Sequence, residues 1–281
     1  MRWVSRVVIG LLLAFSLGLV LGGSSNRQST HSLFDSITHA TSYLEHNQAR
    51  MLRAKSAVGV PFEAYNWGGY ADVYAWNSLG TFARVSGTWT IPAVTCPTAS
   101  TAGVGAQDLI VADWVGMDGF SSGTVEQLGS MSQCFEGVAT YFVWWEMYPG
   151  GSSQVSFAYP GDVIHASVVR RTSESYQLSL TDSTNPEVSF STTQSCLVMD
   201  LCLNDSAEWI VERPAYQIGV TPEADYGTTT FTHMSATLRH SRYKFATYGI
   251  WTVDATDSYA LAKVSPLVKG SSYTSTWLNS Y

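Results

Sequence analysis

The chain has 281 residues, of which 45% are hydrophobic and only 13% are charged, and its formal net charge is −7. The charged share is about half of the roughly 25% found in average globular domains. No cluster of lysine and arginine follows residue 60, which excludes the basic surface of a nucleic-acid-binding protein. A protein with few ion pairs loses little stability when its carboxylates are protonated, so this composition is compatible with acidic surroundings.

Residues 1–23 have the layout of a secretory signal peptide. Arg2 and Arg6 precede an apolar run from Val7 to Leu21, and small residues follow it. A run of about 15 residues is too short for a stable membrane span. We therefore predict a secreted protein that retains no membrane span once the signal is removed.

Residues 24–62 are predicted to form a separate and partly helical segment. Apolar residues such as Leu33, Phe34 and Ile37 follow helical spacing, and glycine is absent from residue 26 to residue 58. The segment is either a surface helix or linker, or a pro-segment that covers an acidic domain at neutral pH. In the second case, protonation of its histidines would help to release it. Half of the chain's histidines lie here: His31, His39 and His46.

Residues 63–281 consist of short runs bounded by Gly, Pro, Ser and Asp. The run 82–92 alternates, with Val85, Trp89 and Ile91 on one face, as a half-buried strand does. Many short strands without a long helical pattern predict an all-β domain, built as an antiparallel sandwich or barrel. Nine strands are expected, at residues 82–92, 109–117, 140–148, 154–159, 163–169, 176–180, 208–211, 228–234 and 244–253.

Four cysteines fit an exported protein with two disulfides. Three pairings are possible, and proximity along the chain favours Cys96 with Cys134 and Cys196 with Cys202. No spacing of Cys and His resembles a zinc site, so neither a metal nor another cofactor is expected.

The usual hydrolase signatures are absent from the sequence. There is no G-x-S-x-G elbow for a serine nucleophile, no H-E-x-x-H metal motif, and no Asp-Thr-Gly or Asp-Ser-Gly of an aspartic protease. Six short segments stand out instead, which together are rich in aromatic residues, glycine and carboxyl or amide side chains. They are NWGGY from Asn66, WVGMDG from Trp114, VEQLG from Val125, WWEMYP from Trp144, AEWIVE from Ala207 and ADYG from Ala224.

In this order, the six segments resemble the eqolisin family of glutamic peptidases, whose patterns read NWGG, WVGIDG, ILQTG, WYEWYP, AEWIVED and ADFG. The resemblance implies a bent, lectin-like sandwich of two large antiparallel sheets. It implies a secreted endopeptidase that acts on polypeptides in acid, and we expect a monomer. Gln127 and Glu212 match the catalytic residues of the family. Four more residues match positions that line or support the site: Trp114, Asp118, Trp144 and Glu146.

The chemistry of these side chains agrees with that assignment. A glutamate can take a proton from the attacking water and then deliver it to the leaving amine. The amide of Gln127 donates N–H groups that do not titrate, so it still works in acid. Glu208 and Glu212 share one strand face about 13 Å apart, which predicts that only one of them does the chemistry. The chain departs from the family at Glu126 and at Arg213, the second of which puts a positive charge beside Glu212.

Two other functions remain open at this stage. A bent sandwich lined with tryptophan and carboxylates also fits a glycoside hydrolase that takes its acid and base from Glu126, Glu146, Glu208 and Glu212. The other alternative is a carbohydrate- or surface-binding module without catalytic activity.

Overall fold

A computed structural model of the chain describes residues 61–74, 81–97, 108–197, 202–216, 219–239, 245–254 and 259–280. These residues form strands almost throughout, with one short 3₁₀ turn, η1 (Pro186–Val188). Within these ranges, no helix is long and apolar enough to span a bilayer. The predicted signal peptide, and all but the last two residues of the predicted segment 24–62, lie outside the described residues.

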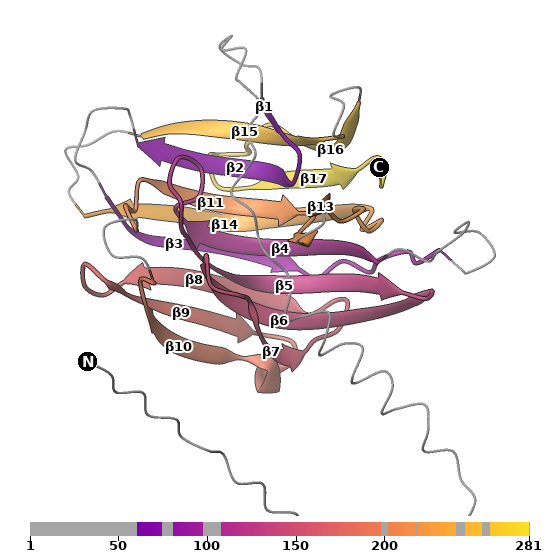
Figure 1. Cartoon of the computed structure of the whole chain (residues 1–281), viewed down its shortest axis with the longest axis horizontal. Helices are drawn as coiled ribbons and strands as arrows, with labels where there is room; N and C mark the ends of the chain where they lie inside the picture. The colour runs from indigo at the N-terminus through magenta and orange to yellow at the C-terminus, as the bar shows by residue number, and fades with distance from the viewer. Residues whose placement is uncertain are drawn as a thin grey trace, which may run out of the picture. The chain divides into compact units, whose positions relative to one another are not determined.

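The strands form two antiparallel sheets that share β14 (Figure 1). The short sheet runs in the order β10 (Phe190–Ser195), β9 (Ser175–Asp182), β8 (Val163–Arg170), β3 (Phe82–Thr90) and β14 (Thr228–Leu238). The long sheet continues from β14 through β17 (Tyr273–Trp277), β16 (Ala260–Val264), β15 (Phe245–Val253), β2 (Trp67–Tyr74), β11 (Ser206–Glu212), β4 (Leu109–Met117), β5 (Val125–Phe135), β6 (Val138–Tyr148) and β7 (Ser153–Phe157). Strand β1 (Phe62–Ala64) pairs in parallel with β15, and β12 (Ala215–Tyr216) and β13 (Gly219–Val220) form a separate hairpin.

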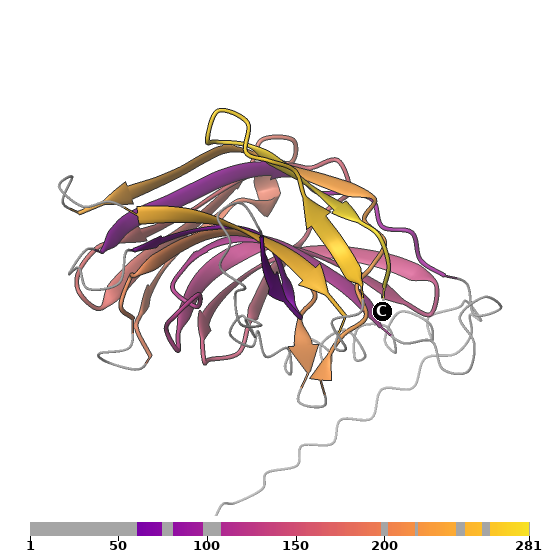
Figure 2. The same ribbon diagram turned by 90° about the horizontal axis from the view of Figure 1, so that it is seen from above.

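Strand β14 passes from one sheet to the other. Its residues Thr228 to Phe231 pair with β17, and from Thr232 onward it pairs with β3. The register shifts between Thr232 and Ser235, where His233 has a φ of 50°. Such a bulge bends a strand and increases its twist, which lets one strand serve two layers. The strands curve into an arch when seen from above (Figure 2).

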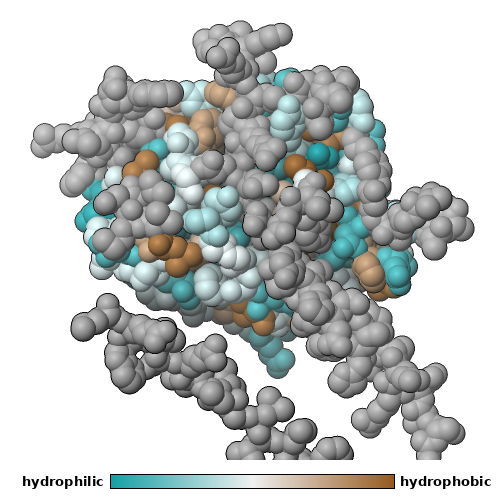
Figure 3. All heavy atoms as spheres, viewed as in Figure 1, coloured by the Kyte–Doolittle hydropathy of each residue, from teal (hydrophilic) through white to brown (hydrophobic). Residues whose placement is uncertain are grey.

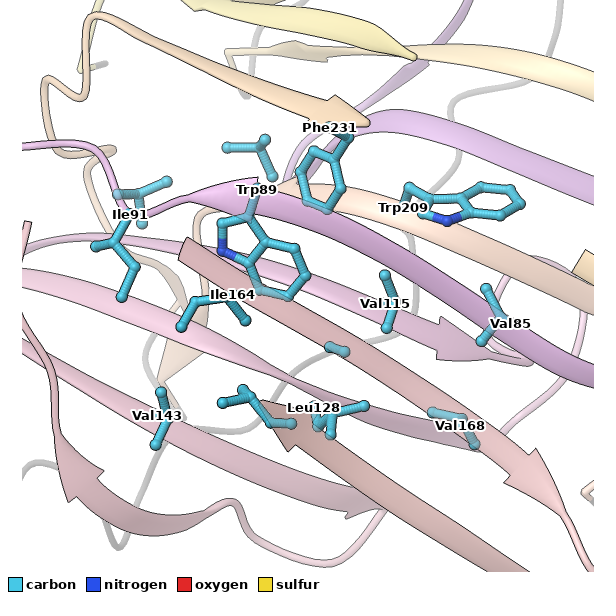
Figure 4. Packing of buried hydrophobic residues seen from close by; sticks show 14 of the residues in the cluster. Val85, Trp89, Ile91, Val115, Leu128, Val143, Ile164, Val168, Trp209 and Phe231 are labelled. Carbon is cyan, nitrogen blue, oxygen red and sulfur yellow. The ribbon is translucent and has the colours of Figure 1, made fainter. Parts of the chain in front are cut away.

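The main core lies between the two sheets. Strands β3 and β8 pack against β4, β5 and β11, and the side chains between them form one apolar cluster (Figure 4). Trp89 and Trp209 belong to it, each with its indole N–H donated inside the core, to Ser130 Oγ and to the Ser86 carbonyl, both at 2.8 Å. These two tryptophans are therefore structural.

The outer face of the long sheet, which points away from the short sheet, carries a second apolar cluster. It contains Trp67, Trp114, Trp144, Phe142 and Ile210, all buried. As a result, β4 and β11 are buried at every position. On the side of the molecule seen in Figure 3, hydrophobic residues lie in small patches among hydrophilic ones. The long sheet thus carries buried apolar side chains on both of its faces.

The structure confirms the all-β prediction and both disulfides. Cys96 bonds to Cys134, and Cys196 bonds to Cys202. All nine predicted strands are present, and eight agree with the observed bounds to within two residues, whereas β14 runs four residues beyond its predicted end. Five further strands of five residues or more were not predicted: β2, β5, β10, β16 and β17.

Candidate active site

The candidate site lies on the outer face of the long sheet, where β11, β4, β5 and β6 run side by side. Alternate residues of a strand share a face, so Glu212, Trp114, Gln127 and Glu146 project from the same side. The register places Glu212 opposite Ala112, and Gln127 opposite Gly116. Trp114 lies between these two β4 positions. It therefore stands between the two predicted catalytic residues.

Two glycines make room for these side chains. A Cβ on Gly129 would lie 2.7 Å from the Cβ of Trp114, and a Cβ on Gly116 would lie 2.8 Å from Trp114 Cζ3 and 3.1 Å from the Cβ of Gln127. Contacts under 3.0 Å are essentially never made by a real Cβ atom. The glycines of WVGMDG and VEQLG therefore let the indole and the amide lie close to the backbone of neighbouring strands.

The carboxyl group of Glu212 accepts a hydrogen bond on each oxygen. Trp114 Nε1 donates to Oε2 at 2.8 Å, and Asn66 Nδ2 donates to Oε1 at 3.2 Å. All three residues are buried. Trp67 packs its ring edge-on against Trp114 with centroids 5.0 Å apart, which fixes the plane of the donating indole. The glutamate is thus held in one orientation by two neutral donors.

Gln127 is oriented by Glu146 on the adjacent strand. The two residues are directly opposite each other in the β5–β6 ladder, and Gln127 Nε2 donates to Glu146 Oε2 at 2.7 Å. Both side chains are fully buried. This bond uses one of the two N–H groups of the amide, so the second N–H is left for a further acceptor.

Trp144 and Asp118 contribute to the site in different ways. Trp144 is buried in the apolar cluster of the outer face, opposite Gly129. Asp118 lies at the end of β4 with a φ of 67°, and its two carboxyl oxygens accept from the backbone N–H groups of Asn204 and Asp205 at 2.9 and 3.0 Å. Asp118 therefore ties the end of β4 to the segment directly before β11.

Several buried carboxyl groups surround this framework. Burial, with a further contribution from Asp205, raises the pKa of Asp118 to about 7. Burial, followed by the proximity of Asp118, raises the pKa of Glu126 well above its usual range. Glu208 lies on the face of Glu212, and burial raises its pKa as well. These groups hold their protons in acid, so they add no negative charge there.

Asn66 was missed as a site residue by the sequence analysis. It entered only as the first letter of NWGGY, and its contact with Glu212 joins residues 146 positions apart. No local signal marked it, because Asn66 precedes β2, an unpredicted strand that pairs with the distant strand ending at Glu212. Among the residues that the structure describes, no group of three or more His, Cys, Asp or Glu side chains could hold a metal ion.

The fold and the site define a bent β-sandwich protein with a glutamate and a glutamine side chain held on one sheet face. Residues 65–277 match the model of the Peptidase A4 family, and the chain belongs to this family. The resemblance to the eqolisin glutamic peptidases drawn from six short segments is thereby confirmed.

One relative by sequence and two solved structures are similar to this chain. The chain is 27% identical to aspergillopepsin-2 of Aspergillus niger over 171 residues, which is 56% of this chain and 60% of that protein. Its fold is similar to that of scytalido-glutamic peptidase in complex with a transition state analog inhibitor, with a TM-score of 0.58 and 22% identity over 76% of this chain and 98% of that one. It is also similar to SCP-B, a member of the eqolisin family in complex with the tripeptide Ala-Ile-His, with a TM-score of 0.56 and 20% identity over the same shares of the two chains.

Proposed function

We propose that the protein is a secreted glutamic endopeptidase that cleaves polypeptides in acid, with Glu212 and Gln127 as its catalytic residues. The observation that carries the proposal is the pair of fixed side chains on one face of the long sheet. Glu212 is held by Trp114 and Asn66, and Gln127 is held by Glu146. Membership of the Peptidase A4 family supports the class of reaction. Export is supported by the predicted signal peptide and by the two disulfides.

The reaction proceeds by direct attack of water on the peptide carbonyl carbon. Glu212 takes a proton from the water as the carbon–oxygen bond forms, and the free N–H of Gln127 donates to the carbonyl oxygen as it becomes negative. Glu212 then gives the proton to the leaving nitrogen as the carbon–nitrogen bond breaks. No covalent intermediate with the enzyme is formed. Because the amide does not titrate, its contribution persists at low pH.

The test is digestion of a peptide mixture at several pH values, read by mass spectrometry. We expect Glu212→Gln to lower kcat by about a thousandfold and Gln127→Ala to lower it by about a hundredfold or more. Both variants should retain their thermal unfolding transition. Cleavage by the wild type should survive pepstatin and chelators. Undiminished cleavage by folded Glu212→Gln would refute the proposal.

Glu208 provides a matched control on the same strand. It lies on the same face as Glu212, is equally buried, and holds its proton in acid. Glu208→Gln replaces a neutral carboxyl with a neutral amide of the same shape, so kcat should stay within about twofold. A large loss of kcat in this variant would instead indicate a second acid in the chemistry, as a glycoside hydrolase requires.

A further inference from the structure

Arg213 follows the proposed base directly, at a position where the eqolisin pattern AEWIVED has an aspartate. The residue is buried, with 7% of its surface exposed. Its backbone N–H donates to the Asn66 carbonyl at 3.0 Å, which extends the β2–β11 ladder by one bond beyond the pair Glu212–Trp67. Its side-chain Nε donates to the preceding carbonyl in the chain, that of Tyr65, at 2.7 Å. One residue thus fixes two consecutive peptide groups.

These two peptide groups precede and follow the Cα of Asn66, whose side chain meets Glu212. The contacts form a closed path. Glu212 accepts a hydrogen bond from the side chain of Asn66, and the backbone carbonyl of Asn66 accepts one from the backbone N–H of Arg213. Arg213 in turn follows Glu212 in the chain. An aspartate at position 213 would keep the backbone bond to Asn66, but it has no side-chain N–H with which to hold the Tyr65 carbonyl. The second hold on the Asn66 backbone therefore depends on the arginine side chain of this chain.

We propose that Arg213 is a positioning residue, which acts through Asn66 to hold the carboxyl group of Glu212 in its reactive orientation. The inference rests on the proposed function of Glu212. The acceptor of the Arg213 side chain is a peptide carbonyl, which does not titrate, so the contact persists in acid. Burial lowers the pKa of Arg213. The nearby carboxyl groups of Glu223 and Asp254 act in the opposite direction and favour the charged guanidinium.

Two substitutions separate the hydrogen bond from the charge. Arg213→Met keeps a long side chain and removes both. Arg213→Lys keeps the charge opposite Glu223 and Asp254 but places a methylene group where Arg213 has its Nε–H. We expect each variant to lower kcat by about tenfold, as the loss of one hydrogen bond that orients a charged group would, with KM within twofold. Asn66→Ala should have the same effect.

The double variant Asn66→Ala with Arg213→Lys tests whether Arg213 acts through Asn66. Once the Asn66 side chain is absent, the arginine has nothing to position, so kcat should equal that of Asn66→Ala alone. A merely structural arginine would lower the melting temperature of all Arg213 variants while leaving kcat unchanged. Wild-type kcat in folded Arg213→Lys, or independent losses that multiply to about a hundredfold in the double variant, would overturn the inference.

Arg170 supplies a matched control. Its Nε also donates to a backbone carbonyl, that of Thr172 at 3.0 Å, but on the exposed surface of the short sheet. Arg170→Met should leave kcat unchanged. Glu212→Gln, measured in parallel, distinguishes the catalytic role of Glu212 from the positioning role of Arg213. Activity in Glu212→Gln would remove both proposals, whereas inactive Glu212→Gln beside fully active Arg213 variants would remove the positioning role alone.

Discussion

At the scale of single residues, the carboxyl group of Glu146 decides which edge of the Gln127 amide it contacts, and so which edge is left for the proposed substrate. Oxygen Oε2 of Glu146 accepts from Gln127 Nε2 at 2.7 Å, so the oxygen edge of the amide is turned elsewhere. A glutamine at position 146 could donate to Gln127 Oε1 and stabilise the flipped amide equally well. The fixed orientation of Gln127, the proposed oxyanion donor, therefore depends on the neighbouring acid.

Glu146→Gln should for this reason lower kcat by about tenfold, since about half or more of the molecules would present the wrong edge and the rest would be less rigid. KM should change little, because Glu146 is fully buried and its carboxyl group is engaged by the amide of Gln127. Steady-state kinetics on one acid-cleaved peptide would measure both constants, with Glu208→Gln as the reference for a buried exchange of Glu for Gln on the same face. A kcat equal to that of the wild type would show that the orientation of Gln127 does not depend on this acid.

At the scale of elements, the β4–β5 pair sets the position of Trp114 through Gly129. A Cβ at this position would lie 2.0 Å from the Asp113 carbonyl oxygen as well as 2.7 Å from the Trp114 Cβ, and both contacts involve atoms that cannot rotate away. Gly129→Ala should therefore force the strands apart, lower the free energy of unfolding by about 2–3 kcal/mol, and move the indole that donates to Glu212. Urea titration and kcat would report the two effects.

Gly151→Ala is the control for this change, because a Cβ there meets nothing within 4 Å. Its free energy of unfolding should stay within about 0.5 kcal/mol of the wild type. If both glycine variants behaved alike, the close approach of β5 to Trp114 would have no energetic consequence.

The elements also show what the sequence could and could not predict. Half-buried strands such as β3 were found by alternation, but β5 was not, although it carries Gln127. Its sequence VEQLGSMSQCF mixes polar and apolar residues without a period, yet ten of its eleven positions are buried because both faces of the long sheet are covered. Gln127 and Glu212 were identified from short motifs. Asn66 and the Arg213 contact were not, because both depend on the pairing of β2 with β11, which lie far apart in the sequence.

The burial of carboxyl groups is the other feature that could not be predicted from sequence patterns. Glutamates on strands normally face solvent, but Glu126 and Glu208 are fully buried here. The surroundings that bury them are assembled from distant strands and loops, so no local pattern signals it. Their presence changes how the whole molecule responds to pH.

At the scale of the whole molecule, these groups predict a protein that is most stable in acid. Burial raises the pKa of Asp113 and of Glu223 to about 8 and that of Asp72 to about 6, while the unfolded chain would release these protons near pH 4. A raised pKa in the folded state means that the native protein binds the proton more tightly than the unfolded one. The stabilisation is therefore fully present below about pH 4 and is lost progressively as the pH rises from there through the folded pKa values of about 6 to 8.

The melting temperature of the protein should accordingly fall between about pH 5 and pH 8, in contrast to most proteins, which gain stability over the acid part of this range. Asp113→Asn offers the sharpest test, because the amide has nearly the shape of the protonated carboxyl and cannot ionise. Its melting temperature should match that of the wild type near pH 4 and exceed it by roughly 5 °C at pH 8, so that the pH profile becomes flatter. Glu187→Gln, an exposed exchange on η1, should leave the profile unchanged. A wild-type melting temperature that rises steadily from pH 4 to pH 8 would show that the buried carboxyls do not govern stability, and the physical case for a protein built to work in acid would be lost with it.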